Sequence, residues 1–203
     1  MSRLQKLGGI AALINVTVAI AMLAVATMLI GVATMSDPNQ LIELAIDNPG
    51  PLLLQDGLKL IAAAVSAVLV WALASYLSPN NSTLLLVAIG CGFGSVVCLA
   101  GNAILSLYTI SQATPDAPAT FLHHLNRLIG ILAWAAIGLD GLWLLLVSGI
   151  ALKRQQLPRP LCYLGCGMGG LSLVPPLGII VLLLSMVWSV WLGLVLLTAE
   201  PTG

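Results

Sequence analysis

Long apolar runs joined by short polar connections dominate the chain. A bilayer core of about 30 Å takes about twenty helical residues at 1.5 Å per residue. In lipid, a spanning segment must satisfy its own backbone amides, which it does by coiling. The pattern predicts an all-α, multi-pass transmembrane helix bundle, with the whole chain, 1–203, as a single integral membrane domain. The six expected spans are residues 10–34, 57–77, 84–110, 128–152, 161–176 and 178–198.

The last two expected spans share one uninterrupted apolar run, from Leu161 to Thr198. As a single helix this run would be about 57 Å long, nearly twice the bilayer core. Pro175 and Pro176 remove two amide donors and restrict the residue before them, so we expect the helix to break there. A single kinked and steeply tilted helix is the alternative.

The connection after the first span, 36–51, contains apolar residues at 41, 42, 44, 45 and 46 between acidic ones. This pattern predicts a short helix that lies in the membrane interface.

The seven basic residues divide unequally between the two predicted sides of the membrane. Lys59 and Arg127 lie near one side. Five lie on the other: Arg3, Lys6, Lys153, Arg154 and Arg159. Because basic residues concentrate on the cytoplasmic side, this distribution predicts that both termini are cytoplasmic.

Composition supports a membrane location and narrows the range of partners. Hydrophobic residues make up 60% of the chain and charged residues 7%, against about 25% charged in an ordinary soluble domain. The formal net charge is zero, so the basic surface that a nucleic acid would require is missing. We expect the lipid bilayer as the main partner, with other membrane subunits or a second copy as further ones, and no nucleic acid.

The cysteines lie inside or at the edges of apolar segments, which argues against a secreted disulfide framework. We expect buried, inert thiols; a redox or metal role is the alternative. They are Cys91, Cys98, Cys162 and Cys166.

Asp140 lies about twelve residues into the fourth expected span, near the centre of the bilayer. A carboxylate at that depth costs several kcal/mol, so it must face the bundle interior, carry a proton or find a partner. One interpretation is a proton or cation site. The other is a protonated acid that bonds to a neighbouring helix.

A second group of polar residues is expected to gather at the outer ends of two spans. Asp56 and Lys59 have the three-residue spacing of a helical pair. Adjacent histidines do not point at one ion from a regular helix, so an interfacial polar cap is favoured over cofactor ligation and no metal site is predicted. The group consists of Asp56, Lys59, His123, His124, Asn126 and Arg127.

Two glycine pairs at four-residue spacing, Gly90 with Gly94 and Gly165 with Gly169, predict grooves for close helix packing. We expect the third and fifth spans to meet there, with Cys91 near Cys166. Asn15 and Asn102, inside spans, are expected to bond across helices.

Several segments resemble a broad family of bacterial membrane proteins known only as a domain of unknown function. The segments are Arg3–Gly9, Ser36–Asn39, Leu157–Gly165 and Trp188–Gly193. The resemblance implies a six-helix bundle in the bacterial inner, or plasma, membrane and transfers no catalytic residue.

The sequence contains no paired nucleophile and base, no metalloprotease motif and no phosphate-binding loop. We therefore expect a non-enzymatic protein without a cofactor. The leading hypothesis is an accessory or stabilising subunit of a larger membrane complex. The alternatives are a small proton-coupled transporter that uses Asp140, and a haem- or pigment-binding subunit that uses His123 or His124.

Overall fold

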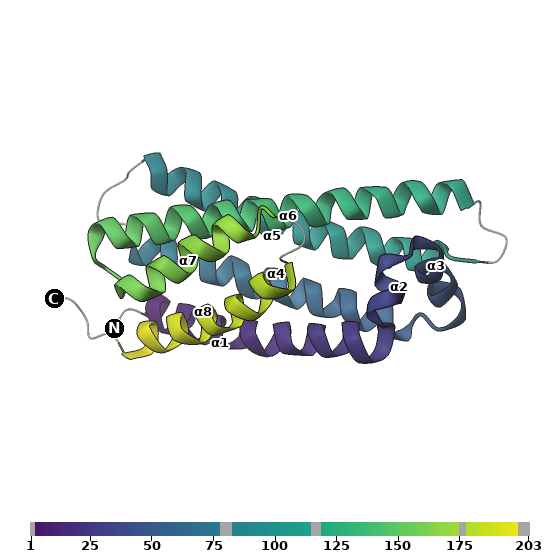
Figure 1. Cartoon of the computed structure of the whole chain (residues 1–203), viewed down its shortest axis with the longest axis horizontal. Helices are drawn as coiled ribbons and strands as arrows, with labels where there is room; N and C mark the ends of the chain where they lie inside the picture. The colour runs from purple at the N-terminus through teal and green to yellow at the C-terminus, as the bar shows by residue number, and fades with distance from the viewer. Residues whose placement is uncertain (1–2, 78–82, 115–118, 175–177, 199–203) are drawn as a thin grey trace.

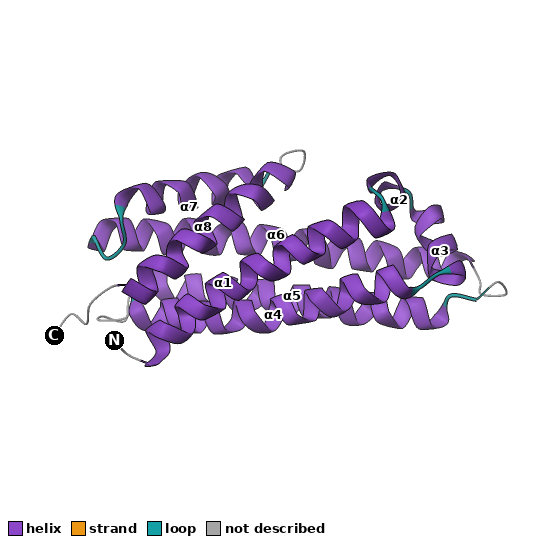
Figure 2. Cartoon of the chain, turned by 90° about the horizontal axis from the view of Figure 1, so that it is seen from below, coloured by secondary structure: helices purple, strands orange, loops and turns teal. Residues whose placement is uncertain are grey.

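The computed structural model describes residues 3–77, 83–114, 119–174 and 178–198, which form an elongated helical bundle (Figure 1). Figure 2 shows helices joined by short loops, with no strand in these ranges. The elements are α1 (Arg3–Ala24), the π-helix η1 (Val25–Ile30), α2 (Val32–Ser36), α3 (Pro38–Asp47), α4 (Gly50–Tyr76), α5 (Thr83–Gln112), α6 (Ala119–Arg154), α7 (Arg159–Leu171) and α8 (Gly178–Thr198).

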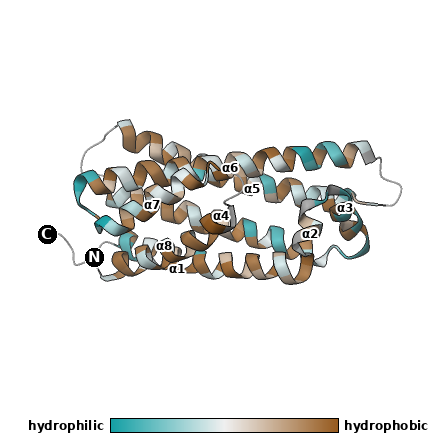
Figure 3. Ribbon diagram, in the orientation of Figure 1, coloured by the Kyte–Doolittle hydropathy of each residue, from teal (hydrophilic) through white to brown (hydrophobic). Residues whose placement is uncertain are grey.

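Five helices in the described part of the chain are long and apolar enough to cross a membrane. They are α1 together with η1, α4, α5, α6 and α8. Hydrophobic residues cover most of their length, and hydrophilic ones gather at the α6–α7 connection and around α3 (Figure 3). The all-α, multi-pass fold predicted from the sequence is therefore confirmed.

The predicted fifth span differs from the structure. Residues 161–176 were expected to cross the membrane, but α7 ends at Leu171 and has 13 residues, about 20 Å of helix. It packs against α8, so the long apolar run forms two helices and the single kinked helix is excluded. Pro175 and Pro176 lie outside the described residues. The two helices form a hairpin along part of the bundle (Figure 1).

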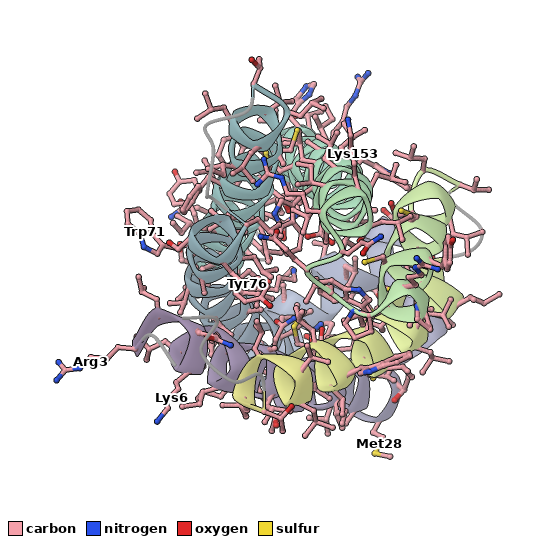
Figure 4. The ribbon with its side chains drawn as sticks, turned by 90° about the vertical axis from the view of Figure 1, so that its left-hand side faces the viewer. Arg3, Lys6, Met28, Trp71, Tyr76 and Lys153 are labelled. Carbon is pink, nitrogen blue, oxygen red and sulfur yellow. The ribbon has the colours of Figure 1, made fainter. Side chains whose placement is uncertain are left out.

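Neighbouring helices pack in the order α1, α4, α5, α6, α7, α8 and back to α1, so the bundle is a ring. α1 begins and α8 ends at the same end of the bundle, where α6 also turns into α7 (Figure 1). We call this the basic end, because Arg3, Lys6 and Lys153 project outward there (Figure 4). The opposite end carries α2 and α3, and we call it the α3 end.

Two helices begin earlier than the apolar runs indicated. α4 begins at Gly50 where residue 57 was expected, and α6 begins at Ala119 where residue 128 was expected. The added turns contain polar residues, which end a lipid-compatible run without ending a helix.

The short helix expected after the first span is confirmed as α3. The side chain of Asp37 caps it by accepting a hydrogen bond from the Asn39 amide at 2.9 Å.

Close packing fills the bundle at the basic end. The fully buried leucines there are Leu73, Leu77, Leu161, Leu192 and Leu196. Near them Trp143 and Trp188 meet edge to face, with ring centroids 6.2 Å apart. Tyr76 donates a hydrogen bond to the Gln156 carbonyl at 3.1 Å, and Arg154 donates one to the Leu77 carbonyl. These bonds tie the end of α4 to the α6–α7 connection.

The glycines of α7 form a close helix contact, but with α6 and not with the third span. A Cβ at Gly169 would lie 2.7 Å from Leu145 Cγ, and one at Gly165 would clash with the hydroxyl of Ser148, both on α6. Because α7 packs against α6 and α8, the expected pairing of the third and fifth spans is wrong.

The glycines of α5 follow a different register from the expected one. A Cβ at Gly94 would meet Leu139 at 3.2 Å, whereas one at Gly90 would meet nothing within 4 Å. Gly92 is the residue in tight contact, where a Cβ would lie 2.8 Å from Trp143. The packing role predicted for Gly90 therefore belongs to Gly92.

Candidate functional site

A cavity of about 150 Å³ lies at the α3 end of the bundle, between α4, α5, α6 and the segment from η1 to α3. One wall is apolar and includes Ile30, Leu41 and Ile42. The polar side chains lie on the three long helices: Gln55, Asp56, Lys59, Ser106, Thr109 and Asn126. The cavity therefore combines a polar wall with an apolar wall formed partly by a short interfacial helix.

The polar wall centres on an ion pair within α4. The Lys59 ammonium lies 2.7 Å from a carboxylate oxygen of Asp56 and donates a second hydrogen bond to Asn102 Oδ1 at 3.1 Å. Asn102 in turn donates to the carbonyl of Ile129 on α6 at 2.8 Å. Asp56 and Asn102 are buried, at 2% and 3% exposure, so these bonds pair their polar side chains where water is scarce.

Two groups on this wall have hydrogen-bonding capacity that the described residues leave unused. Gln55 is 7% exposed, and its side-chain oxygen is buried without a hydrogen-bond donor. An ammonium has three donor hydrogens, and Lys59 uses two of them in the bonds described above. The cavity thus offers one unused acceptor and one unused donor.

The structure separates the predicted outer polar group into two parts. Asp56, Lys59 and Asn126 line the cavity, and the expected pairing of Asp56 with Lys59 is confirmed. His123, His124 and Arg127 are exposed on α6 and do not line it. Gln55, which also lines the cavity, and Asn102, which bonds to Lys59, were not assigned to the predicted polar group. Asn102 was expected only to bond across helices, which it does.

Asp140 lies on the face of α6 that points into the helix ring. Its neighbour Leu139 contacts α5 at Gly94, and its other neighbour Gly141 packs on Gly169 of α7 and on Ser172, which follows that helix. Asp140 therefore points between α5 and α7, on the same face as Ile129, which lines the cavity about 16 Å away along the helix.

The carboxylate of Asp140 is exposed in the structure, although Ala136 and Leu144, one turn away on either side, are buried. No hydrogen bond or ion pair joins the side chain of Asp140 to another described residue. Of the outcomes expected for an acid at this depth, orientation toward the bundle interior is the one that the structure shows.

Within the described residues, no three or more His, Cys, Asp or Glu side chains lie close enough together to hold a metal ion. All four cysteines are free thiols; Cys162 is buried, and Cys91, Cys98 and Cys166 are partly buried. The candidate chemistry of the bundle therefore rests on hydrogen bonding, the Asp56–Lys59 pair and the carboxylate of Asp140.

Comparison with known families gives a match to the model described as Domain of unknown function (DUF4386), which covers residues 8–200. The chain belongs to this family. The match runs from the first turns of α1 to beyond the end of α8, and it confirms the resemblance to a family of unknown function. No curated protein and no solved structure matches the chain.

Proposed function

We propose that this DUF4386 protein is a non-enzymatic inner-membrane protein that carries protons, with Asp140 as the titrating group. The observation that supports it most is the direction of Asp140, which faces the interior of the helix ring from the same side of α6 as the cavity. An ionisable residue inside a membrane bundle is expensive, and such residues commonly serve proton or ion pathways.

The depth of Asp140 fits this role. It lies thirteen residues before Lys153, about 20 Å from the basic end and within a bilayer core of about 30 Å. The leucine core at the basic end closes the ring on one side of Asp140, and the cavity lies toward the other side. In this proposal, Asp140 takes up a proton from the α3 end, and release requires the packing at the basic end to loosen.

Proton flux through the purified chain in liposomes tests the proposal. A pH-sensitive dye inside the vesicles reports acidification after a membrane potential is imposed. We expect Asp140→Asn to abolish the flux, because an amide cannot take up and release the proton. Asp47→Asn, at an exposed acid on α3, is the control and keeps the flux. Equal flux in wild type and Asp140→Asn contradicts the proposal.

An accessory or stabilising role is a second candidate, and the incomplete ring supports it. The α7–α8 hairpin separates α1 from α6 only along part of the bundle (Figure 1). Toward the α3 end, α1 and η1 pack on α4 while α6 packs on α5. A helix from another membrane subunit fits between them in this proposal. Purification in mild detergent tests it, because a lone monomer without a co-purifying membrane protein contradicts it.

A further inference from the structure

We propose that the cavity at the α3 end binds a small neutral amphiphile, with a hydrogen-bonding head on the polar wall and an apolar chain on the other wall. A primary amide with a short alkyl chain represents this class. The inference goes beyond proton carriage, because the cavity residues that bind the molecule do not include Asp140.

The charge balance of the cavity favours a neutral ligand. Asp56 and Lys59 neutralise each other at 2.7 Å, so the polar wall carries no net charge. A carboxylate ligand would compete with Asp56 for the ammonium and leave one acid without a partner. Burying an unpaired charge costs several kcal/mol, so a charged molecule binds more weakly here than its neutral counterpart.

The two unused hydrogen-bonding groups define the head of the ligand. The oxygen of Gln55 is buried without a donor, which costs about 1–3 kcal/mol for as long as it stays unpaired. The Lys59 ammonium, whose side chain is 21% exposed, keeps a third hydrogen that it can donate to a ligand. A primary amide supplies both, since its NH₂ donates to Gln55 and its carbonyl accepts from Lys59.

The apolar wall and the volume define the rest of the ligand. Ile30, Leu41 and Ile42 face the cavity from η1 and α3 and bury an alkyl chain favourably. A cavity of about 150 Å³ admits a molecule about the size of benzene. This space corresponds to roughly six to eight non-hydrogen atoms, as in hexanamide.

Binding of hexanamide to the full chain in lipid nanodiscs tests the inference, with saturation-transfer NMR as the measurement and empty nanodiscs as the blank. We expect binding to the protein, with hexanoate and n-hexane binding at least about fivefold more weakly, since each lacks one feature that the polar wall recognises. Equal binding of hexanoate overturns the neutral head, and equal binding of n-hexane overturns the polar head. No binding of hexanamide overturns the site.

Two variants locate the binding. Gln55→Leu should weaken hexanamide binding about fivefold through the loss of one hydrogen bond, whereas Gln112→Leu, at an exposed glutamine near the end of α5, should not. Ile42→Trp fills the cavity without touching the ion pair and should abolish binding. Binding that survives both cavity variants overturns the site. Asp140→Asn should keep full affinity, so a failure of proton carriage is distinguishable from a failure of this inference.

Discussion

The ammonium of Lys59 on α4 lies 3.1 Å from the side-chain oxygen of Asn102 on α5. Through its NH₂ group the same asparagine reaches the carbonyl of Ile129 on α6 at 2.8 Å. One buried side chain therefore connects three of the membrane-crossing helices, at the level of the cavity.

Replacing Asn102 by alanine removes both connections and takes one acceptor from the Lys59 ammonium. Loss of a partner to a buried polar group costs about 1–3 kcal/mol, and we expect the free energy of unfolding in mixed detergent micelles to fall by this amount. Asn48→Ala, at an exposed asparagine after α3, is the control and should change little. A loss equal to that of the control would show that Asn102 does not connect the helices.

The Asp56–Lys59 pair predicts non-additive effects of mutation. Lys59→Met leaves the buried Asp56 carboxylate without its cation, and breaking a buried pair costs about 3–5 kcal/mol. The double variant Asp56→Asn with Lys59→Met removes both charges and should recover most of that loss. Unfolding of the wild type, both single variants and the double variant forms a complete cycle. Additive losses would mean that the two charges do not interact.

The contact between α6 and α7 predicts a position-specific effect along one helix. Alanine at Gly169 places a Cβ 2.9 Å from the Leu145 amide nitrogen, so α7 must move away from α6. Overpacking of this kind costs about 1–3 kcal/mol. Gly167→Ala, two residues away, adds a Cβ with no atom within 4 Å. Thermal unfolding should therefore separate the two variants, and equal midpoints would contradict the observed rotation of α7.

Gly31 joins η1 to α2 with a φ of +89° and ψ of 137°, a backbone conformation that side chains other than glycine rarely adopt. Gly31→Ala should cost about 1–3 kcal/mol and displace α2 and α3, which form one wall of the cavity. We expect faster proteolysis within 32–47. Gly57→Ala on α4, where a Cβ meets nothing within 4 Å, should leave this segment as resistant as in wild type.

The fold could be predicted from the sequence where lipid alone dictates the outcome. Apolar runs of spanning length indicated the helices and the connection that became α3. The same signal could not reveal the true start of α4 at Gly50, because polar residues at a membrane surface end the apolar run but not the helix. Nor could it show that α7 stops at Leu171, since the residues beyond are as apolar as the helix itself.

The candidate site could be predicted only in part. The three-residue spacing of Asp56 and Lys59 is a local signal and indicated their pairing. The contributions of Gln55 and Asn102 depend on how α4, α5 and α6 are rotated against one another, which no local pattern specifies. The same limit explains why the packing contact was expected at Gly90 and is found at Gly92. Glycines alternate in Gly90-Cys91-Gly92-Phe93-Gly94, so the sequence does not show which of them faces the neighbouring helix.

The proposed proton carriage requires Asp140 to face a water-accessible interior of a lipid-embedded ring, and thiol labelling tests that orientation. Single cysteines replace Asp140 and Trp134, both exposed on α6, in a chain whose four native cysteines are changed to alanine. Trp134 lies on the outer side of the helix and should contact lipid. In intact membranes, a charged, membrane-impermeant maleimide should label the cysteine of Asp140→Cys and leave that of Trp134→Cys unlabelled. Labelling of both cysteines equally, or no labelling of the cysteine at position 140, would show that Asp140 does not face a water-accessible interior.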